Sequence, residues 1–254
     1  MILTRLLKYS RIMKLSVVMP CFNEIRTVEK ILRKVVLAPV PKEIKEIELI
    51  VIDDRSTDGT IDLLNKIASD PRKHIGLQDN QKFILLHQEQ NGGKGRALRA
   101  GFAKSSGQII LVQDADLEYD PQDYFRLLSP ITEGFADVVF GSRFIGTERR
   151  VLYFNHSIVN KMLTFFSNLL TNINLTDMET CYKVFDAKLL KSIKLESNRF
   201  GFEPEVTAKV AKLKPRIYEI GIRYHGRTYE EGKKITWKDG IAALWFIVKY
   251  NLFR

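Results

Sequence analysis

Two aspartates, Asp114 and Asp116, give the sharpest chemical signal in the sequence. They follow the apolar, strand-like run 108–113, and side chains two positions apart in extended chain project to the same side. Paired carboxylates repel unless a cation lies between them, and hard oxygen ligands suit Mg²⁺ or Mn²⁺ with positions left open for phosphate oxygens. We therefore predict a divalent metal site here, with Glu118 next in the same spacing as a candidate third ligand. The alternative interpretation is a solvated acidic turn.

A second acidic pair, Asp53 and Asp54, follows the apolar run 47–52 and precedes a helix start. Carboxylates in this position can accept hydrogen bonds from a base N–H or from ribose hydroxyls, so we predict that both contact a nucleotide. The competing interpretation is that Asp54 or Asp58 only caps the following helix. We assign the capping role to Asp58.

Two further segments, each a less specific signal, complete the set of candidate residues. In VVMPCFNE, Pro20 turns the chain out of the first strand, Phe22 can lie against a base or ribose, and Glu24 falls at a helix N-terminus, where a carboxylate is favoured in any case. In NGGKG, glycines permit close backbone approach and Lys94 adds positive charge. The spacing is neither that of a P-loop nor that of a dinucleotide fingerprint, and such a turn alone is more often just a helix start.

The elements that must position these residues alternate between strand-like and helical patterns. Strand-like runs occupy 15–19, 47–54, 82–87, 108–113 and 136–140, with helical patterns between them. Such alternation indicates an α/β fold with a mostly parallel sheet, in which ligands bind beyond the carboxyl ends of the strands. The polar clusters fall at those ends, so we predict one shared site.

The second half of the chain changes character. Residues 151–175 are apolar and Asn-rich and predict one or two amphipathic helices; a strand at 181–185, a helix from 205, a strand at 217–224 and a helix from 237 follow. We divide the chain into a basic amphipathic segment (1–13), one α/β domain (14–225) and a C-terminal loop with an amphipathic helix (226–254).

The composition of the chain limits the classes of partner that it could bind. The net charge of +10 favours nucleoside diphosphates, nucleic acid or an anionic membrane, but the cations are dispersed and no nucleic-acid-binding motif occurs. Two cysteines give no disulfide framework, so a reducing cytoplasm is expected. The longest strongly apolar run, 241–248, is far shorter than a membrane-spanning helix needs.

Five motifs in a fixed order carry a family resemblance: VVMPCFNE, VIDDRSTDGT, NGGKGRALRAG, DADLEYDP and VFGSRF. Together, over roughly residues 14–235, they resemble the family 2 glycosyltransferases, in particular the dolichyl-phosphate mannose synthase-like branch. The resemblance implies a GT-A fold, with a Rossmann-like sheet flanked by helices and a C-terminal helical extension. It implies inverting transfer of a sugar, mannose or glucose, from a nucleoside diphosphate sugar to a polyprenyl or dolichyl phosphate. The alternative acceptor is a saccharide or other hydroxyl in cell-envelope polysaccharide or glycoconjugate synthesis.

The resemblance also implies residue roles. Asp116, with Asp114, would hold the metal–diphosphate group, Arg143 would face phosphate, and Asp177 would lie near the acceptor. Arg227 and Lys233 would form a basic pair on a closing loop, although YEEGKK leaves the choice between Lys233 and Lys234 open. The residues expected around the nucleotide sugar are Pro20, Phe22, Glu24, Asp53, Asp54, Lys94, Asp114 and Ala115.

The acceptor decides whether a base is needed. A phosphate oxygen is already ionised, whereas a hydroxyl acceptor needs a carboxylate base, for which Asp177 and Glu203 are the candidates. Apolar faces with flanking cations predict peripheral contact with the cytoplasmic face of a membrane; they are formed by Leu3, Leu6 and Leu7, by Ile241, Leu244, Trp245 and Val248, and by the stretch 151–175. Equally, these faces could pack on the core, on a second subunit or on a membrane-protein partner.

Overall fold

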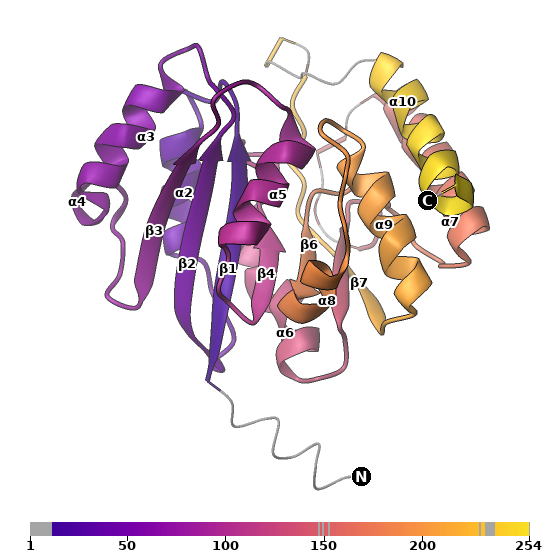
Figure 1. Cartoon of the computed structure of the whole chain (residues 1–254), viewed down its shortest axis with the longest axis horizontal. Helices are drawn as coiled ribbons and strands as arrows, with labels where there is room; N and C mark the ends of the chain where they lie inside the picture. Colours follow the sequence, from indigo (N-terminus) through magenta and orange to yellow (C-terminus); the bar gives the residue numbers. More distant parts are fainter. Residues whose placement is uncertain are drawn as a thin grey trace, which may run out of the picture.

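One mixed sheet forms the centre of the part of the chain that the structure describes, which comprises residues 12–146, 148, 150, 151, 153–228, 230, 231 and 237–253. The computed structural model gives seven strands there: β1 (Met13–Cys21), β2 (Ile44–Asp53), β3 (Gln81–His87), β4 (Ile109–Val112), β5 (Val138–Ser142), β6 (Lys183–Asp186) and β7 (Ile217–Gly221). Their order is β3-β2-β1-β4-β6-β5-β7 (Figure 1). Only β6 runs antiparallel to its neighbours, β4 and β5.

Helices flank this sheet. In chain order they are α2 (Val28–Val36), α3 (Thr60–Ser69), α4 (Pro71–Ile75), α5 (Lys94–Lys104), the 3₁₀ turn η1 (Pro121–Asp123), α6 (Tyr124–Thr132), α7 (Phe154–Thr171), α8 (Ala187–Ser192), α9 (Phe202–Leu213), α10 (Trp237–Val248) and the π-helical turn η2 (Lys249–Phe253). α5 packs on β1 and β2, while α7, α9 and α10 pack on one another on the right of Figure 1. The predicted α/β class, the mostly parallel sheet and the C-terminal helix are confirmed.

The central strands bring their carboxyl ends to one level. The four residues of β4 are buried, as are Leu15 to Met19 of β1, because helices cover both faces of a parallel sheet. The register pairs Cys21 with Asp53 and Asp53 with His87. The loops that follow these strands therefore begin side by side, and the predicted polar clusters meet at this edge of the sheet.

Several predicted bounds differ from the structure. The helix predicted from Glu24 begins at Val28, and the stretch 151–175 contains the single helix α7. β7 ends at Gly221, after which Tyr224 forms an isolated bridge with Tyr119. Nothing tests the domain boundaries, and residues 1–11 of the predicted N-terminal segment lie outside the described residues.

The buried carboxylate Glu48 connects β2 with β1 and with the segment before β4, at the opposite edge of the sheet. It accepts hydrogen bonds from the Ser16 hydroxyl (2.6 Å) and from the backbone and hydroxyl of Ser106 (2.5 and 2.8 Å), and it pairs with Lys14 (2.9 Å). Burial alone would raise the pKa of Glu48, but the donors from Ser106, Ser16 and Lys14 outweigh it and lower the pKa to about 2. The charged form therefore stabilises the fold.

We predict that Glu48→Gln destabilises the protein at pH 7 and that its effect shrinks in acid. Because the folded pKa lies below the usual value of 4.5, the contribution is complete above that value and is lost as pH falls toward 2. The difference in free energy of unfolding between the two proteins should fall by about 2 kcal/mol from pH 7 to pH 3. Urea unfolding at both pH values measures it, and a difference that does not change with pH would contradict the prediction.

Candidate active site at the carboxyl edge of the sheet

The two aspartates after β4 are held by different cations. Asp114 pairs with the amine of Lys94 at 2.9 Å, and the Asp116 carboxylate pairs with the guanidinium of Arg227 at 2.8 Å. Between them, Ala115 is buried, and its carbonyl accepts a hydrogen bond from the Thr27 hydroxyl at 3.2 Å. The segment is therefore anchored to the start of α2, with Asp114 held beside Lys94 and Asp116 beside Arg227.

Arg227 lies among three carboxylates. Its guanidinium contacts Asp116, Glu118 (Nε to Oε1, 3.0 Å) and Glu24 (3.5 Å), and its backbone N–H also donates to Glu118 at 3.1 Å. Burial, followed by the charges of Asp114 and Glu118, raises the pKa of Asp116 to about 8, and Arg227 lowers it only in part. Burial and the neighbouring carboxylates thus oppose the ionisation of Asp116, and positive charge brought beside it would favour its charged form.

The donor set fits a hard divalent ion bound together with a diphosphate. The described residues contain no group of three or more His, Cys, Asp or Glu side chains that could hold a metal ion by themselves. Mg²⁺, however, is commonly bound by only one or two carboxylates plus substrate phosphates, and Asp114 and Asp116 supply that number. The Arg227 guanidinium supplies positive charge to Asp116 and Glu118 in this structure. It would have to leave these two carboxylates when a divalent ion bound there.

The second acidic pair organises the loops beside this segment. Asp54 accepts hydrogen bonds from the N–H groups of Gly92 (2.9 Å) and Gly93 (2.6 Å). Asp53 is fully buried and accepts from the backbone of Ser56. A side chain at Gly93 would collide with the 198–199 backbone, and its φ of +84° favours glycine. Both aspartates therefore hold the glycine-rich turn and the β2 loop; their contact with a nucleotide stays a prediction.

The loop after β1 packs against the loop after β2. Phe22 leaves 38% of its surface exposed there, next to Pro20 at the end of β1. Asn23 adopts a φ of +53°, and its side chain accepts the N–H of Thr57 at 2.7 Å. The predicted capping residue Asp58 accepts from the N–H of Thr60, the first residue of α3, at 3.0 Å, but the N-cap position of this helix is occupied by Gly59. The exposed ring of Phe22 is thus held on a rigid turn.

A buried arginine–aspartate pair lies on the other side of the site. Arg143, just after β5, donates Nε and Nη2 to Asp177 at 2.7 Å each, and its backbone N–H donates to the same carboxylate at 3.0 Å. The guanidinium lies 5.2 Å from the ring centroid of Tyr224, whose hydroxyl donates to Glu118 at 2.8 Å. Through these contacts, Tyr224 connects the Arg143 side of the site with the Asp116 side.

The model of glycosyl transferase family 2 matches residues 16–194. The chain belongs to glycosyltransferase family 2. This family 2 enzyme is 30% identical over 232 residues to an undecaprenyl-phosphate mannosyltransferase of Micrococcus luteus, with 87% of each chain covered. It is 28% identical to a dodecaprenyl-phosphate galacturonate synthase of Rhizobium johnstonii and 26% identical to an undecaprenyl-phosphate 4-deoxy-4-formamido-L-arabinose transferase of Proteus mirabilis. The chain spans only 62% and 64% of these last two proteins.

Solved structures confirm the GT-A fold of the glycosyltransferase. A glucosyl-3-phosphoglycerate synthase of Mycobacterium tuberculosis superposes with a TM-score of 0.69 at 20% identity, over 94% of this chain and 81% of the other. Structures of that synthase have been solved with UDP and Mn²⁺, and with UDP and Mg²⁺. At this identity the likeness concerns the fold alone.

The remaining expected residues of this glycosyltransferase are placed as follows. Lys233 lies outside the described residues. Glu205 accepts the N–H groups of Glu196 and Ser197 at 2.7 Å each, so it orders the loop before α9. Glu203, left open by the sequence, is buried and pairs with Lys94 at 2.8 Å.

Sequence reasoning missed two ionisable residues, the half-buried Glu179 and the fully buried Lys183. Glu179 and Lys183 lie in the TDMETCYKVF motif, where a lysine within a strand-like run was the available signal. Burial alone would lower the pKa of Lys94, but Asp114 and Glu203 help to raise it well above its usual value. Lys94, Glu203, Glu179 and Lys183 therefore form a group of interacting ionisable side chains in the interior of the site.

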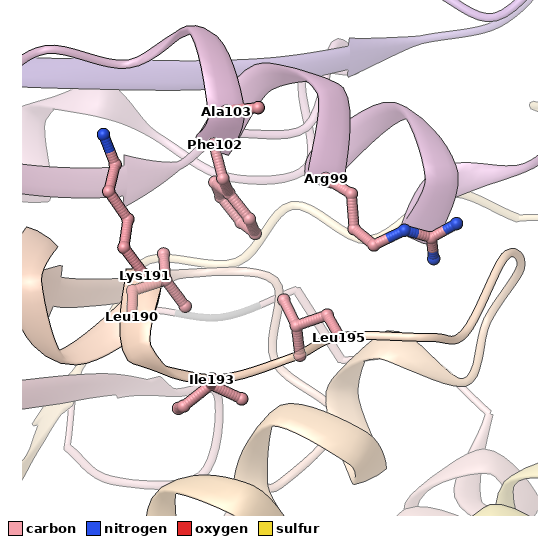
Figure 2. A pocket seen from close by; sticks show the side chains of 7 residues that line it. All are labelled: Arg99, Phe102, Ala103, Leu190, Lys191, Ile193 and Leu195. Atoms are coloured by element: carbon pink, nitrogen blue, oxygen red, sulfur yellow. The ribbon is translucent and has the colours of Figure 1, made fainter.

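Two surface hollows among the described residues of this glycosyltransferase lie away from the site. One, of about 260 Å³, is lined by α5, α8 and the segment that follows α8. Figure 2 shows Phe102 and Leu195 pointing toward one another there, while Arg99 and Lys191 extend to opposite ends. Lys191 donates to the Ser105 carbonyl and Arg99 to that of Ser197. These cations serve the fold, and the hollow contains none of the predicted site residues.

We predict that Asp177→Asn destabilises this glycosyltransferase by about 3 kcal/mol, because it leaves the Arg143 guanidinium buried without its counter-charge. The chain offers a matched control in Asp137→Asn. The Arg216–Asp137 pair has the same two-pronged contact, but its side chains are 46% and 32% exposed, against 16% and 0% for Arg143 and Asp177. The control should cost less than about 1 kcal/mol. Equal losses in urea unfolding would contradict the predicted role of burial.

Proposed function

We propose that the chain transfers a hexose, mannose or glucose, from a nucleoside diphosphate sugar to a polyprenyl phosphate with inversion at the anomeric carbon. The observation that carries this proposal is the match over 87% of both chains to an undecaprenyl-phosphate mannosyltransferase. The next relatives are named for different sugars but again for a polyprenyl phosphate. The acceptor class is therefore better supported than the sugar.

On the donor side, Asp114 and Asp116 would hold Mg²⁺ or Mn²⁺ with the diphosphate. The ion would supply positive charge against the charge that develops on the leaving diphosphate. Lys94 is fixed by Asp114 and Glu203, with its amine 2.9 and 2.8 Å from their oxygens, and is pre-positioned for the same group. Arg227 is the mobile partner in this proposal, because it must exchange its carboxylates for phosphate oxygens.

On the acceptor side, Arg143 would bind the phosphate. Asp177 engages its Nε and Nη2 and so fixes the plane of the guanidinium. A phosphate oxygen then attacks the anomeric carbon, the bond from that carbon to the diphosphate oxygen breaks, and the electron pair leaves with the nucleoside diphosphate. No proton has to be removed from an ionised phosphate. Asp177 can therefore orient Arg143 and need not act as a base.

A polyprenyl acceptor lies in a membrane, and one face of the molecule suits that location. α7 and α10 pack side by side (Figure 1) and, with η2, expose Phe154, Ile158, Val159, Met162, Phe165, Phe166, Leu169, Leu170, Ile241, Trp245, Val248, Leu252 and Phe253. None of the helices that the structure describes could span a bilayer. Together with the net charge of +10, this apolar face supports peripheral contact with an anionic membrane, on its cytoplasmic side.

We predict that the purified protein, with Mn²⁺ or Mg²⁺, transfers sugar to undecaprenyl phosphate and that Asp116→Ala lowers turnover at least about 100-fold while the protein stays folded. Radiolabel transfer from GDP-mannose and UDP-glucose measures turnover, and circular dichroism checks the fold. Full activity of the variant would contradict the metal site. Transfer to saccharides but not to the lipid phosphate would instead support the hydroxyl-acceptor alternative.

We also predict that the double variant Phe165→Asp, Leu169→Asp lowers co-sedimentation with anionic phosphatidylglycerol vesicles about tenfold, because it places charge on the apolar face of α7. The matched control is Phe125→Asp, Phe135→Asp, which changes two other exposed phenylalanines, 50% and 54% exposed, outside the α7–α10 face. The control should bind vesicles as the unmodified protein does. Absence of vesicle binding by the unmodified protein at every salt concentration would contradict the membrane proposal.

A further inference from the structure

One half-buried carboxyl group in the interior of the site takes no part in the donor or acceptor contacts proposed for this reaction. Glu179 lies on the loop between α7 and β6, and its Oε1 atom is shielded from solvent without a hydrogen-bond partner among the described residues. Leaving a buried acceptor unpaired costs about 1–3 kcal/mol, so each such group in a native protein calls for an explanation.

The loop holds Glu179 in a fixed place. The amine of Lys183 donates to the carbonyls of Met178 and Thr180, the residues on either side of it. Further hydrogen bonds fix the flanking backbone: the N–H of Met178 donates to the Thr164 hydroxyl at 3.1 Å, and that of Asp177 to Glu219 at 3.0 Å. A loop restrained in this way holds the Glu179 carboxyl group, with its unpartnered Oε1 atom, in a defined position.

Glu179 has electrostatic partners in both halves of the proposed reaction. Its carboxyl group interacts electrostatically with Glu203 and Lys183, and with the Arg143–Asp177 pair. Glu203 belongs to the donor side, because it pairs with Lys94 at 2.8 Å, and Lys94 in turn pairs with Asp114 at 2.9 Å. Arg143 and Asp177 form the acceptor side.

The transferred sugar must lie between the leaving diphosphate and the attacking phosphate, because its anomeric carbon exchanges one oxygen for the other. A side chain that interacts with the residues on both sides, and whose Oε1 atom has no partner among the described residues, is therefore placed to receive a group of the sugar. We propose that Glu179 binds a hydroxyl group of the transferred hexose and thereby helps to set which sugar donors the site accepts. This assignment rests on the proposed function.

The chemistry of the group suits this role. Burial, followed by the charge of Glu203, raises the pKa of Glu179 to about 8, although Lys183 and Arg143 oppose the rise. Near neutral pH the carboxyl group is therefore largely protonated and offers one donor and one acceptor. It can bind a sugar hydroxyl without adding negative charge beside two phosphate groups.

Two variants of similar size test the assignment. Glu179→Leu removes the hydrogen bond, whereas Glu179→Gln keeps a donor and an acceptor in the same place. Isothermal titration with Mn²⁺ would compare GDP-mannose with GDP, and UDP-glucose with UDP. We expect Glu179→Leu to bind the sugar nucleotide at least tenfold more weakly but the nucleoside diphosphate within twofold, and Glu179→Gln to stay within about fivefold for both. Glu179→Met provides a second apolar variant if the leucine protein does not fold.

Glu219→Gln is the control for a merely structural effect. Glu219 binds the same loop through the N–H groups of Thr176 and Asp177, so this change should lower the melting temperature without altering the ratio of sugar-nucleotide to nucleotide affinity. An equal loss of both affinities in Glu179→Leu, or a change only in the KM for undecaprenyl phosphate, would overturn the assignment. Failure of the unmodified protein to bind any sugar nucleotide would refute the proposed function itself.

Discussion

The attraction between one guanidinium and three carboxylates determines how this site is arranged. Glu24, Asp116 and Glu118 come from separate parts of the chain, and at close range their charges repel unless a cation lies among them. Arg227 supplies that cation and, through it, attaches the segment after β7 to the loops after β1 and β4. The arginine and a metal–diphosphate group would serve the same electrostatic need. Substrate binding and the position of the C-terminal segment are therefore coupled in the proposed function.

Acidic and basic side chains alternate from the Arg227 cluster into the interior of the protein. Asp114, Lys94 and Glu203 form one row of contacts, and Asp177 with Arg143 forms another. Buried ions are tolerated only when they are paired and hydrogen-bonded, so each row fixes the side chains that belong to it. Catalytic groups gain from such fixed positions, because little reorganisation remains when charge develops during reaction. Glu179 is the exception, because it interacts with residues of both rows while its Oε1 atom has no hydrogen-bond partner among the described residues.

Hydrophobic periodicity was enough to predict the α/β class and the strands that carry the site, because buried parallel strands have nearly continuous apolar sequences. It also located the acidic clusters, since these directly follow the strands. Periodicity could not predict that β6 is antiparallel and lies between β4 and β5, because the pairing of distant strands leaves no local pattern. For the same reason it missed Glu203 as the partner of Lys94. Asp54 illustrates a further limit: the sequence indicated a polar role, but its binding to the N–H groups of Gly92 and Gly93 depends on how the loop folds back.

The reversed direction of β6 bears on how such an enzyme can diversify. The strand returns the chain from the long excursion through α7, and the loop before it carries Asp177 and Glu179 into the site. The loops after β1, β2 and β4 form the opposite side, to which Glu203 and Arg227 from the later sequence each add one side chain. In the proposed function, substitutions in the loop before β6 would therefore change the contacts of the transferred sugar and leave the contacts of the leaving diphosphate in place.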